Sequence, residues 1–181
     1  MGRAEIRFTR EDYGQLPEHL DAELIEGDLV MIPAPTPWHE RLAAALMFEV
    51  MRHVGAEAPN RVQGSRTEIS IGEGAKESIV QPDVVVFPGG TRPTGPGWSI
   101  PTPVWVAEVL SPATARRDRG VKLRLYARKG ISETWLVDPE AETIEVHDLG
   151  AGPHVTHGRG AWAASAVLPG FRVEVDRFFS V

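Results

Sequence analysis

Two acidic residues stand out because each interrupts an apolar segment. Glu108 lies within the run VWVAEVL at residues 104–110. The two-residue period of a strand places it on the same face as Val104, Val106 and Leu110. An unpaired carboxylate in such a place is costly or is forced to take up a proton. Either the carboxylate bonds a backbone amide or an arginine, or it is a metal ligand or a catalytic acid.

Asp83 opens a second apolar run, the segment PDVVVF. An aspartate in the turn before a strand is common and alone needs no functional explanation. Considered together with Glu108, a functional role of Asp83 is favoured, because both acids lie on buried strands of one predicted sheet. Two converging carboxylates repel each other unless a cation lies between them, and hard cations such as Mg²⁺ or Mn²⁺ take carboxylate oxygens.

Lys122 lies on the helix predicted after the Glu108 strand. It shares a face with Asp118 and Tyr126, which lie four residues before and after it. A surface Asp–Lys pair worth only about 0.3–0.5 kcal/mol explains this spacing without function. Near two acids, however, a lysine can orient the attacking water or stabilise the charge that develops on a phosphorane.

The only concentrated positive charge lies in the same segment, and we assign contact with nucleic acid to Arg116, Arg117 and Arg119. Such a run is either a solvated helix face or a phosphate-binding surface. The chain has a formal net charge of −6, whereas proteins that hold DNA through its phosphates usually have a basic surface. Any contact with nucleic acid must therefore come from a local basic patch or be bridged by metal.

The expected elements come from hydrophobic period and from helix caps. The strongest signal is a helix in which Leu42, Leu46 and Val50 recur every fourth residue, with Thr36 as its cap and Gly55 at its end. In chain order we expect a helix at 7–20, a hairpin at 22–32, a helix at 37–54, strands at 66–71, 79–87 and 104–110, a helix at 116–129, and strands at 134–137 and 143–147. This order predicts one α/β domain over residues 1–181, built around a mixed sheet.

Two details of this series are less regular. Gly120 weakens the first half of the helix at 116–129 by about 1 kcal/mol, so we expect that helix to start near Asp118. The Pro- and Gly-rich residues 88–103 predict a long irregular loop.

Composition excludes several classes of protein. The chain has no cysteine, which rules out disulfides, thiolate zinc sites and cysteine nucleophiles and suits a reducing cytoplasm. It has no apolar signal core and no run long enough to span a bilayer, so we expect a cytoplasmic protein without a membrane partner. A P-loop and a Gly-x-Ser-x-Gly elbow are also absent.

Histidines and tryptophans give weaker signals. His154 and His157 lie in a Gly-rich segment, where three-residue spacing is poor evidence for a metal site. The tryptophans, which include Trp98, Trp105 and Trp162, are core residues for the most part, although their number is also consistent with a homodimer interface.

The segment VQPDVVVF, followed by VWVAEVLSPATARRDRGVKLRLYARKGISETWLVDP, resembles the Uma-two family of restriction-endonuclease-like proteins. ELIEGDLVMIPAPTPWHERL and LPGFRVEV are similar to that family as well, so the resemblance spans nearly the whole chain. The family is placed in the PD-(D/E)xK nuclease superfamily. The resemblance implies a restriction-endonuclease-like α+β core of helix, three strands, helix and strand, with helices flanking a mixed sheet and an extra N-terminal hairpin.

The resemblance also implies roles by position. Asp83 matches the aspartate of the PD half, and Glu108 matches the second acid. The superfamily pattern places a lysine two residues later, but Leu110 stands there, and Lys122 resembles a lysine that has migrated to the next helix. Glu23 matches a family acid that can be a further metal ligand, although an ordinary hairpin carboxylate explains it equally well.

The function implied is a Mg²⁺- or Mn²⁺-dependent endonuclease that hydrolyses phosphodiester bonds in DNA. Asp83, Glu108 and Lys122 would be catalytic, and Asp83, Glu108 and Glu23 would be the metal ligands. His39 resembles a family histidine, but a helix cap explains it equally well. The alternative is a non-catalytic module that keeps the nuclease fold and binds nucleic acid or protein, which the negative net charge favours.

Overall fold

The computed structural model describes residues 6–17, 20–55, 61–73, 77–89, 101–150 and 152–180. Its elements, in chain order, are α1 (Arg10–Gly14), β1 (Ala22–Ile25), β2 (Asp28–Met31), α2 (Pro37–Val54), β3 (Val62–Gly64), β4 (Ile69–Ile71), β5 (Ser78–Val80), β6 (Val84–Val86), β7 (Trp105–Val109), α3 (Ala115–Arg117), η4 (Asp118–Lys122), α4 (Leu123–Lys129), β8 (Glu133–Asp138), β9 (Thr143–Asp148), β10 (Val155–His157), β11 (Trp162–Ala164), β12 (Arg172–Glu174) and α5 (Val175–Phe178).

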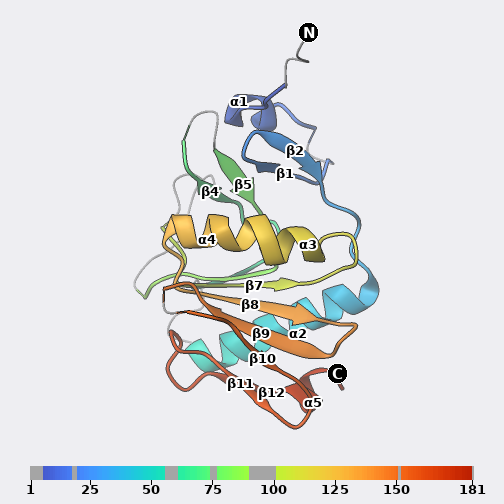
Figure 1. Cartoon of the computed structure of the whole chain (residues 1–181), viewed down its shortest axis with the longest axis vertical. Coiled ribbons are helices and arrows are strands. Elements are labelled where there is room, and N and C mark those ends of the chain that lie inside the picture. The colour runs from blue at the N-terminus through green and yellow to red at the C-terminus, as the bar shows by residue number, and fades with distance from the viewer. Residues whose placement is uncertain are drawn as a thin grey trace.

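A six-stranded sheet, in the order β10-β9-β8-β7-β6-β3, forms the centre of the fold. Its pairs are antiparallel except β7 with β8, which run parallel because the helical segment α3–α4 connects them. Figure 1 shows that segment crossing one face of the sheet, while α2 lies behind it. This arrangement confirms the predicted α+β fold with helices flanking a mixed sheet.

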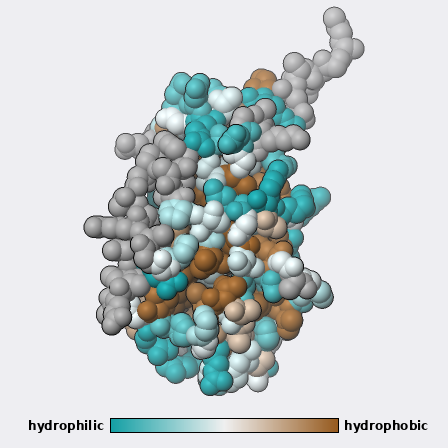
Figure 2. Space-filling model, turned by 90° about the vertical axis from the view of Figure 1, so that its left-hand side faces the viewer, coloured by the Kyte–Doolittle hydropathy of each residue, from teal (hydrophilic) through white to brown (hydrophobic). Residues whose placement is uncertain are grey.

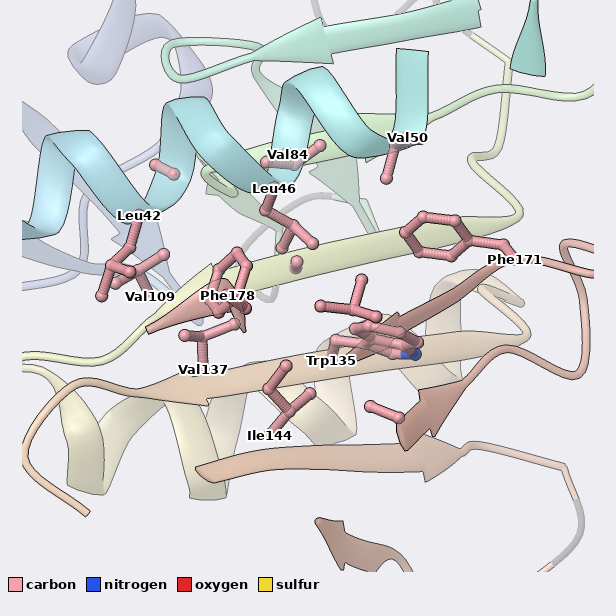
Figure 3. Packing of buried hydrophobic residues seen from close by; sticks show 14 of the residues in the cluster. Leu42, Leu46, Val50, Val84, Val109, Trp135, Val137, Ile144, Phe171 and Phe178 are labelled. Atoms are coloured by element: carbon pink, nitrogen blue, oxygen red, sulfur yellow. The ribbon is translucent and has the colours of Figure 1, made fainter. Parts of the chain in front are cut away.

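Alternate residues of β7 divide the core between the two faces of this sheet. Trp105 and Val109 belong to the apolar cluster under α2, to which that helix contributes Leu42 and Leu46 (Figure 3). Val106 belongs to a second cluster, which packs against α4 on the opposite face. Each fully buried aliphatic side chain stabilises the fold by about 1.5–3 kcal/mol. Any polar side chain on these faces therefore lies in an apolar environment.

The predicted first and last residues of α2 are confirmed. The Thr36 side chain accepts a hydrogen bond from the backbone N–H of His39 at 3.1 Å, and Pro37 occupies the first turn. Gly55 ends the helix at a φ of 84°, a positive value that glycine adopts without strain. The predicted N-terminal hairpin is also present as β1 and β2, whereas the helix expected at residues 7–20 is limited to α1.

The prediction of one strand at residues 79–87 was wrong. The segment forms β5, which pairs with β1 and β4 in a second, four-stranded sheet, and β6, which pairs with β3 and β7. The chain crosses between the two sheets at Gln81-Pro82-Asp83, because Pro82 has no N–H with which to continue a ladder. The Asp83 N–H donates to the Ala107 carbonyl at 3.1 Å. The crossing thus places Asp83 at the seam between the sheets.

The helix after β7 starts earlier than expected. It runs without interruption from α3 through η4 to α4, so it begins at Ala115 rather than near Asp118. Gly120 lies inside η4, a single π-helical turn, which is a feature that often occurs at functional sites. The side chains of Asp118 and Lys122, at the two ends of this turn, are both only 3% exposed. The turn therefore directs two charged residues into the protein.

A pair of glycine substitutions tests this helix. Gly120→Ala is expected to stabilise the protein by about 0.5–1 kcal/mol, because an added Cβ at Gly120 meets no atom within 4 Å and alanine favours helix. Gly130→Ala is expected to destabilise it by about 1 kcal/mol, since Gly130 ends α4 at a φ of 83°. Urea unfolding of both variants checks the prediction, and equal effects of one sign would contradict it.

Two further sequence predictions concern exposed or loop residues. Trp105 and Trp135 are fully buried, whereas Trp162 is 47% exposed. Most of the loop predicted at 88–103, including Trp98, lies outside the described residues.

Figure 2 shows apolar residues gathered in the middle of one face, between more hydrophilic ends. Among the residues described, no helix combines the length and the apolar character that a membrane crossing requires.

Candidate active site

A cavity of about 510 Å³ lies where β1, the Gln81–Asp83 crossing, the end of β7 and η4 come together. Its described lining has twice as many carboxyl groups as permanent cations. The carboxyl groups belong to Asp21, Glu23, Glu40, Asp83, Glu108 and Asp118, and the cations to Arg66, Arg117 and Lys122. A concave site with this excess of negative charge favours the binding of a cation.

Lys122 lies at the centre of the buried charges. Its Nζ is 2.6 Å from Glu108 Oε1, 2.9 Å from Glu23 Oε1 and 3.7 Å from Asp118 Oδ1. Burial alone would lower the pKa of Lys122, but the three carboxylates outweigh burial and raise it above its usual value. The ammonium group therefore stays charged and joins residues that are far apart in the sequence.

Glu108 is 4% exposed and points to the same face of β7 as Val106, as the two-residue period predicts. The hydroxyl group of Tyr126 donates a hydrogen bond to its Oε1. Burial raises the pKa of Glu108 well above its usual range, against the opposing effect of the Lys122 ammonium, and the carboxylate of Asp118 raises it further. The carboxyl group is thus held in place by two partners, the Tyr126 hydroxyl and the Lys122 ammonium.

Asp83 is fixed by a backbone group and by a histidine. Its Oδ2 accepts a hydrogen bond from the Val109 N–H at 2.7 Å and lies 3.4 Å from Nε2 of His39, in the first turn of α2. Burial alone would lower the pKa of His39, but the interaction with Asp83 outweighs it and raises that pKa. Among the described residues, the buried Nδ1 of His39 has no hydrogen-bond partner.

Glu23 connects the N-terminal hairpin to the site. Its Oε1 accepts hydrogen bonds from the Gln81 N–H and from Lys122, both at 2.9 Å. Its Oε2 is buried and accepts no hydrogen bond from the described residues, although Nε of Arg117 lies 3.7 Å away. Since buried carboxylate oxygens are normally satisfied, this atom has the capacity for one more ligand.

The three arginines assigned to nucleic acid lie in different surroundings. Arg117 lines the cavity, where its Nε is buried without a hydrogen-bond partner among the described residues. Arg116 is exposed and does not line the cavity. Arg119 does not line the cavity either. It donates hydrogen bonds to Glu145 and Asp138 at 2.8 and 2.7 Å. The structure brings only Arg117 together with the acids.

The carboxylate oxygens of the cavity are ligands that a hard divalent cation prefers. Their positions, however, do not yet form a complete coordination shell. Asp83, Glu108 and Glu23 all line the cavity, but their oxygens do not gather within 4.8 Å of one another, and Lys122 lies between two of them. Mg²⁺ keeps several waters and is usually bound through one or two carboxylates. Three hard oxygen donors, one with an unsatisfied buried oxygen, are consistent with such a partly hydrated ion.

Two features of the site had little or no signal in the sequence. The Val109 N–H that holds Asp83 is a backbone group, which no residue type reveals. The approach of Arg117 to Glu23 depends on how the helix after β7 packs against the hairpin. The hydrogen bond from Tyr126 to Glu108 did have a signal, because Tyr126 lies one helical turn from Lys122.

Comparisons with known proteins agree with this architecture. A crystal structure described as that of "a putative nuclease belonging to DUF820", from Anabaena variabilis ATCC 29413, matches with a TM-score of 0.79 and 20% sequence identity over 96% of this chain and 98% of that chain. At this identity the likeness shows the fold. No curated protein gives a significant match. The model of the Uma2 family, described as "Putative restriction endonuclease", matches residues 10–176, and the chain therefore belongs to that family.

Proposed function

We propose that the protein is a divalent-metal-dependent endonuclease that hydrolyses phosphodiester bonds in DNA. The observation that carries the proposal is the convergence of Asp83, Glu108 and Lys122 on one cavity from the β5–β6 crossing, β7 and η4. Membership of the Uma2 family, whose model is described as "Putative restriction endonuclease", supports the reaction class. The excess of carboxyl groups over cations in the cavity supports the need for a metal ion.

Asp83 and Glu108 would hold Mg²⁺ or Mn²⁺, with Glu23 as a further ligand. When bound, the metal polarises the scissile phosphate and lowers the pKa of a coordinated water. The protein would orient the two acids through the Val109 N–H on Asp83 and the Tyr126 hydroxyl on Glu108. These partners fix both carboxylates before substrate binds, which reduces the reorganisation needed during the reaction.

Lys122 would act beside the metal rather than as a ligand. Its ammonium group contacts Glu108 and reaches the cavity from η4. In that position it can orient the attacking water or stabilise negative charge on the phosphate in the transition state. Arg117, which lines the same cavity with a buried and unsatisfied Nε, is suited to contact a phosphate oxygen of the substrate.

The role of Arg117 gives a direct prediction. Arg117→Ala is expected to weaken binding of a short DNA duplex by about tenfold or more, because one charge-assisted contact to phosphate is lost. Arg124→Ala is the matched control, since Arg124 is exposed on α4 and does not line the cavity. Fluorescence anisotropy in Ca²⁺ measures binding without cleavage. Equal affinities of the two variants would contradict this role.

The contact of Lys122 with Glu23 and Glu108 favours one alternative function. An ammonium group that already links these acids can serve stability alone, which would leave a non-catalytic module with the nuclease fold. Incubation of the purified protein with supercoiled plasmid DNA in Mg²⁺, Mn²⁺ or EDTA separates the two functions. The proposal predicts nicked or linear DNA only with metal. Intact DNA in every condition, together with no Mn²⁺ binding in calorimetry, would contradict the proposal and support the non-catalytic module.

A further inference from the structure

A second group of metal-binding side chains lies outside the cavity. Glu145, His147 and His154 each offer one ligand atom, and these atoms lie within 4.8 Å of one another, the only such group among the described residues. Nε2 of His147 is 3.0 Å from Oε2 of Glu145. The rings of His147 and His154 stack with centroids 4.4 Å apart.

The sheet brings these residues together. The two-residue period of β9 places Glu145 and His147 on one face. The antiparallel register of β9 with β10 pairs Val146 with Val155, so His154 comes next to His147. The histidines therefore meet through strand pairing, although they are seven positions apart in the sequence.

Arg119 orients the carboxylate of this group. Its Nε donates to Oε1 of Glu145 at 2.8 Å, while Oε2 of the same carboxylate faces His147. An outer partner that fixes a ligand in this way is a usual feature of metal sites in proteins. One ligand atom of Glu145 and one of each imidazole thus lie within 4.8 Å of one another, and the exposed His154 leaves the group open to solvent.

The group is distinct from the proposed nuclease site. Glu145 pairs with Leu136 on β8, and Leu136 pairs in turn with Glu108 on β7. Two strand spacings, about 10 Å, thus separate Glu145 from Glu108, and none of the three residues of the group lines the cavity.

We propose that Glu145, His147 and His154 bind Zn²⁺. Two imidazole nitrogens and one carboxylate oxygen form a donor set that zinc takes readily, with a water as the fourth ligand. The ion would join β9 to β10, the short edge strand of the six-stranded sheet, and would reinforce that edge. This site does not depend on the proposed nuclease function.

Titration calorimetry of the full chain with ZnCl₂ tests the proposal. The wild type and His157→Ala are expected to bind Zn²⁺ equally, because His157 is not in the group. His154→Ala is expected to bind it at least about tenfold more weakly. Glu108→Gln is expected to retain wild-type affinity, which separates this site from the cavity. The visible absorption of the Co²⁺-substituted protein gives a second readout, since its intensity reports tetrahedral ligands.

Three results would overturn the proposal. The first is an absence of Zn²⁺ binding by the wild-type chain. The second is unchanged affinity in His154→Ala. The third is loss of Zn²⁺ binding in Glu108→Gln with retention in His154→Ala, which would place the ion in the cavity. Because His154 is exposed, its replacement is not expected to prevent folding, and circular dichroism checks this.

Discussion

Replacing Glu108 by glutamine is expected to lower the rate of metal-dependent DNA cleavage by at least about 100-fold. Glutamine keeps the size of the side chain but removes the negative charge that would hold the cation. The fold is expected to persist, since Lys122 still has Glu23 and Asp118 as partners. Initial rates of conversion of supercoiled plasmid DNA to the nicked form, in Mg²⁺ and in Mn²⁺, measure the effect.

The matched control is Glu174→Gln, which removes an exposed carboxylate on β12 that does not line the cavity. It is expected to cleave DNA at the wild-type rate. Cleavage by Glu108→Gln at the same rate, in protein purified identically, would show that the activity does not depend on Glu108. The assignment of this residue as a metal ligand of a nuclease would then be lost.

Replacing Lys122 by methionine is expected to destabilise the protein by about 3–5 kcal/mol in EDTA. The side chain of Lys122 is almost fully buried, and its loss leaves the carboxylates of Glu23, Glu108 and Asp118 without their common counter-charge. Methionine fills a similar volume, so the loss of charge rather than a cavity dominates the change. Urea unfolding followed by circular dichroism measures the free energy of unfolding.

Arg124→Met, on the exposed face of the same helical segment, is the control and is expected to change stability by less than about 0.5 kcal/mol. Saturating Mn²⁺ is expected to recover part of the stability lost in Lys122→Met, because a bound cation compensates the same carboxylates. A loss of less than about 1 kcal/mol would instead mean that the buried acids are protonated and need no counter-charge.

Features with a local period could be predicted from the sequence. The repeat of Leu42, Leu46 and Val50 predicted α2, and Thr36 and Gly55 predicted its ends. The single strand expected at 79–87 was wrong, because an apolar run does not reveal which neighbour each half will pair with. That choice is made by distant strands, β1 and β4 for one half and β3 and β7 for the other.

In the candidate site, too, some features follow from a local period and others depend on tertiary packing. The position of Glu108 on a buried face, and of Asp118, Lys122 and Tyr126 on one helix face, follows from strand and helix periods. The meeting of Glu23 with Lys122, 99 positions away, rests on tertiary packing, and only the family resemblance had singled out Glu23.

The neighbours of His154 could not be predicted from the sequence either. Spacing in the sequence draws attention to His154 with His157, whereas the structure places His154 beside His147. The register of β9 with β10 determines this contact, and no local pattern encodes that register.

Asp83 and Glu108 are proposed to hold one divalent cation together. The most direct test is a crystal structure of the wild-type protein soaked in Mn²⁺, with anomalous scattering used to locate the ion. We predict a peak in the cavity within bonding distance of both carboxylates. A cavity without such a peak at saturating Mn²⁺, with Lys122 still linking Glu23 and Glu108, would contradict the claim.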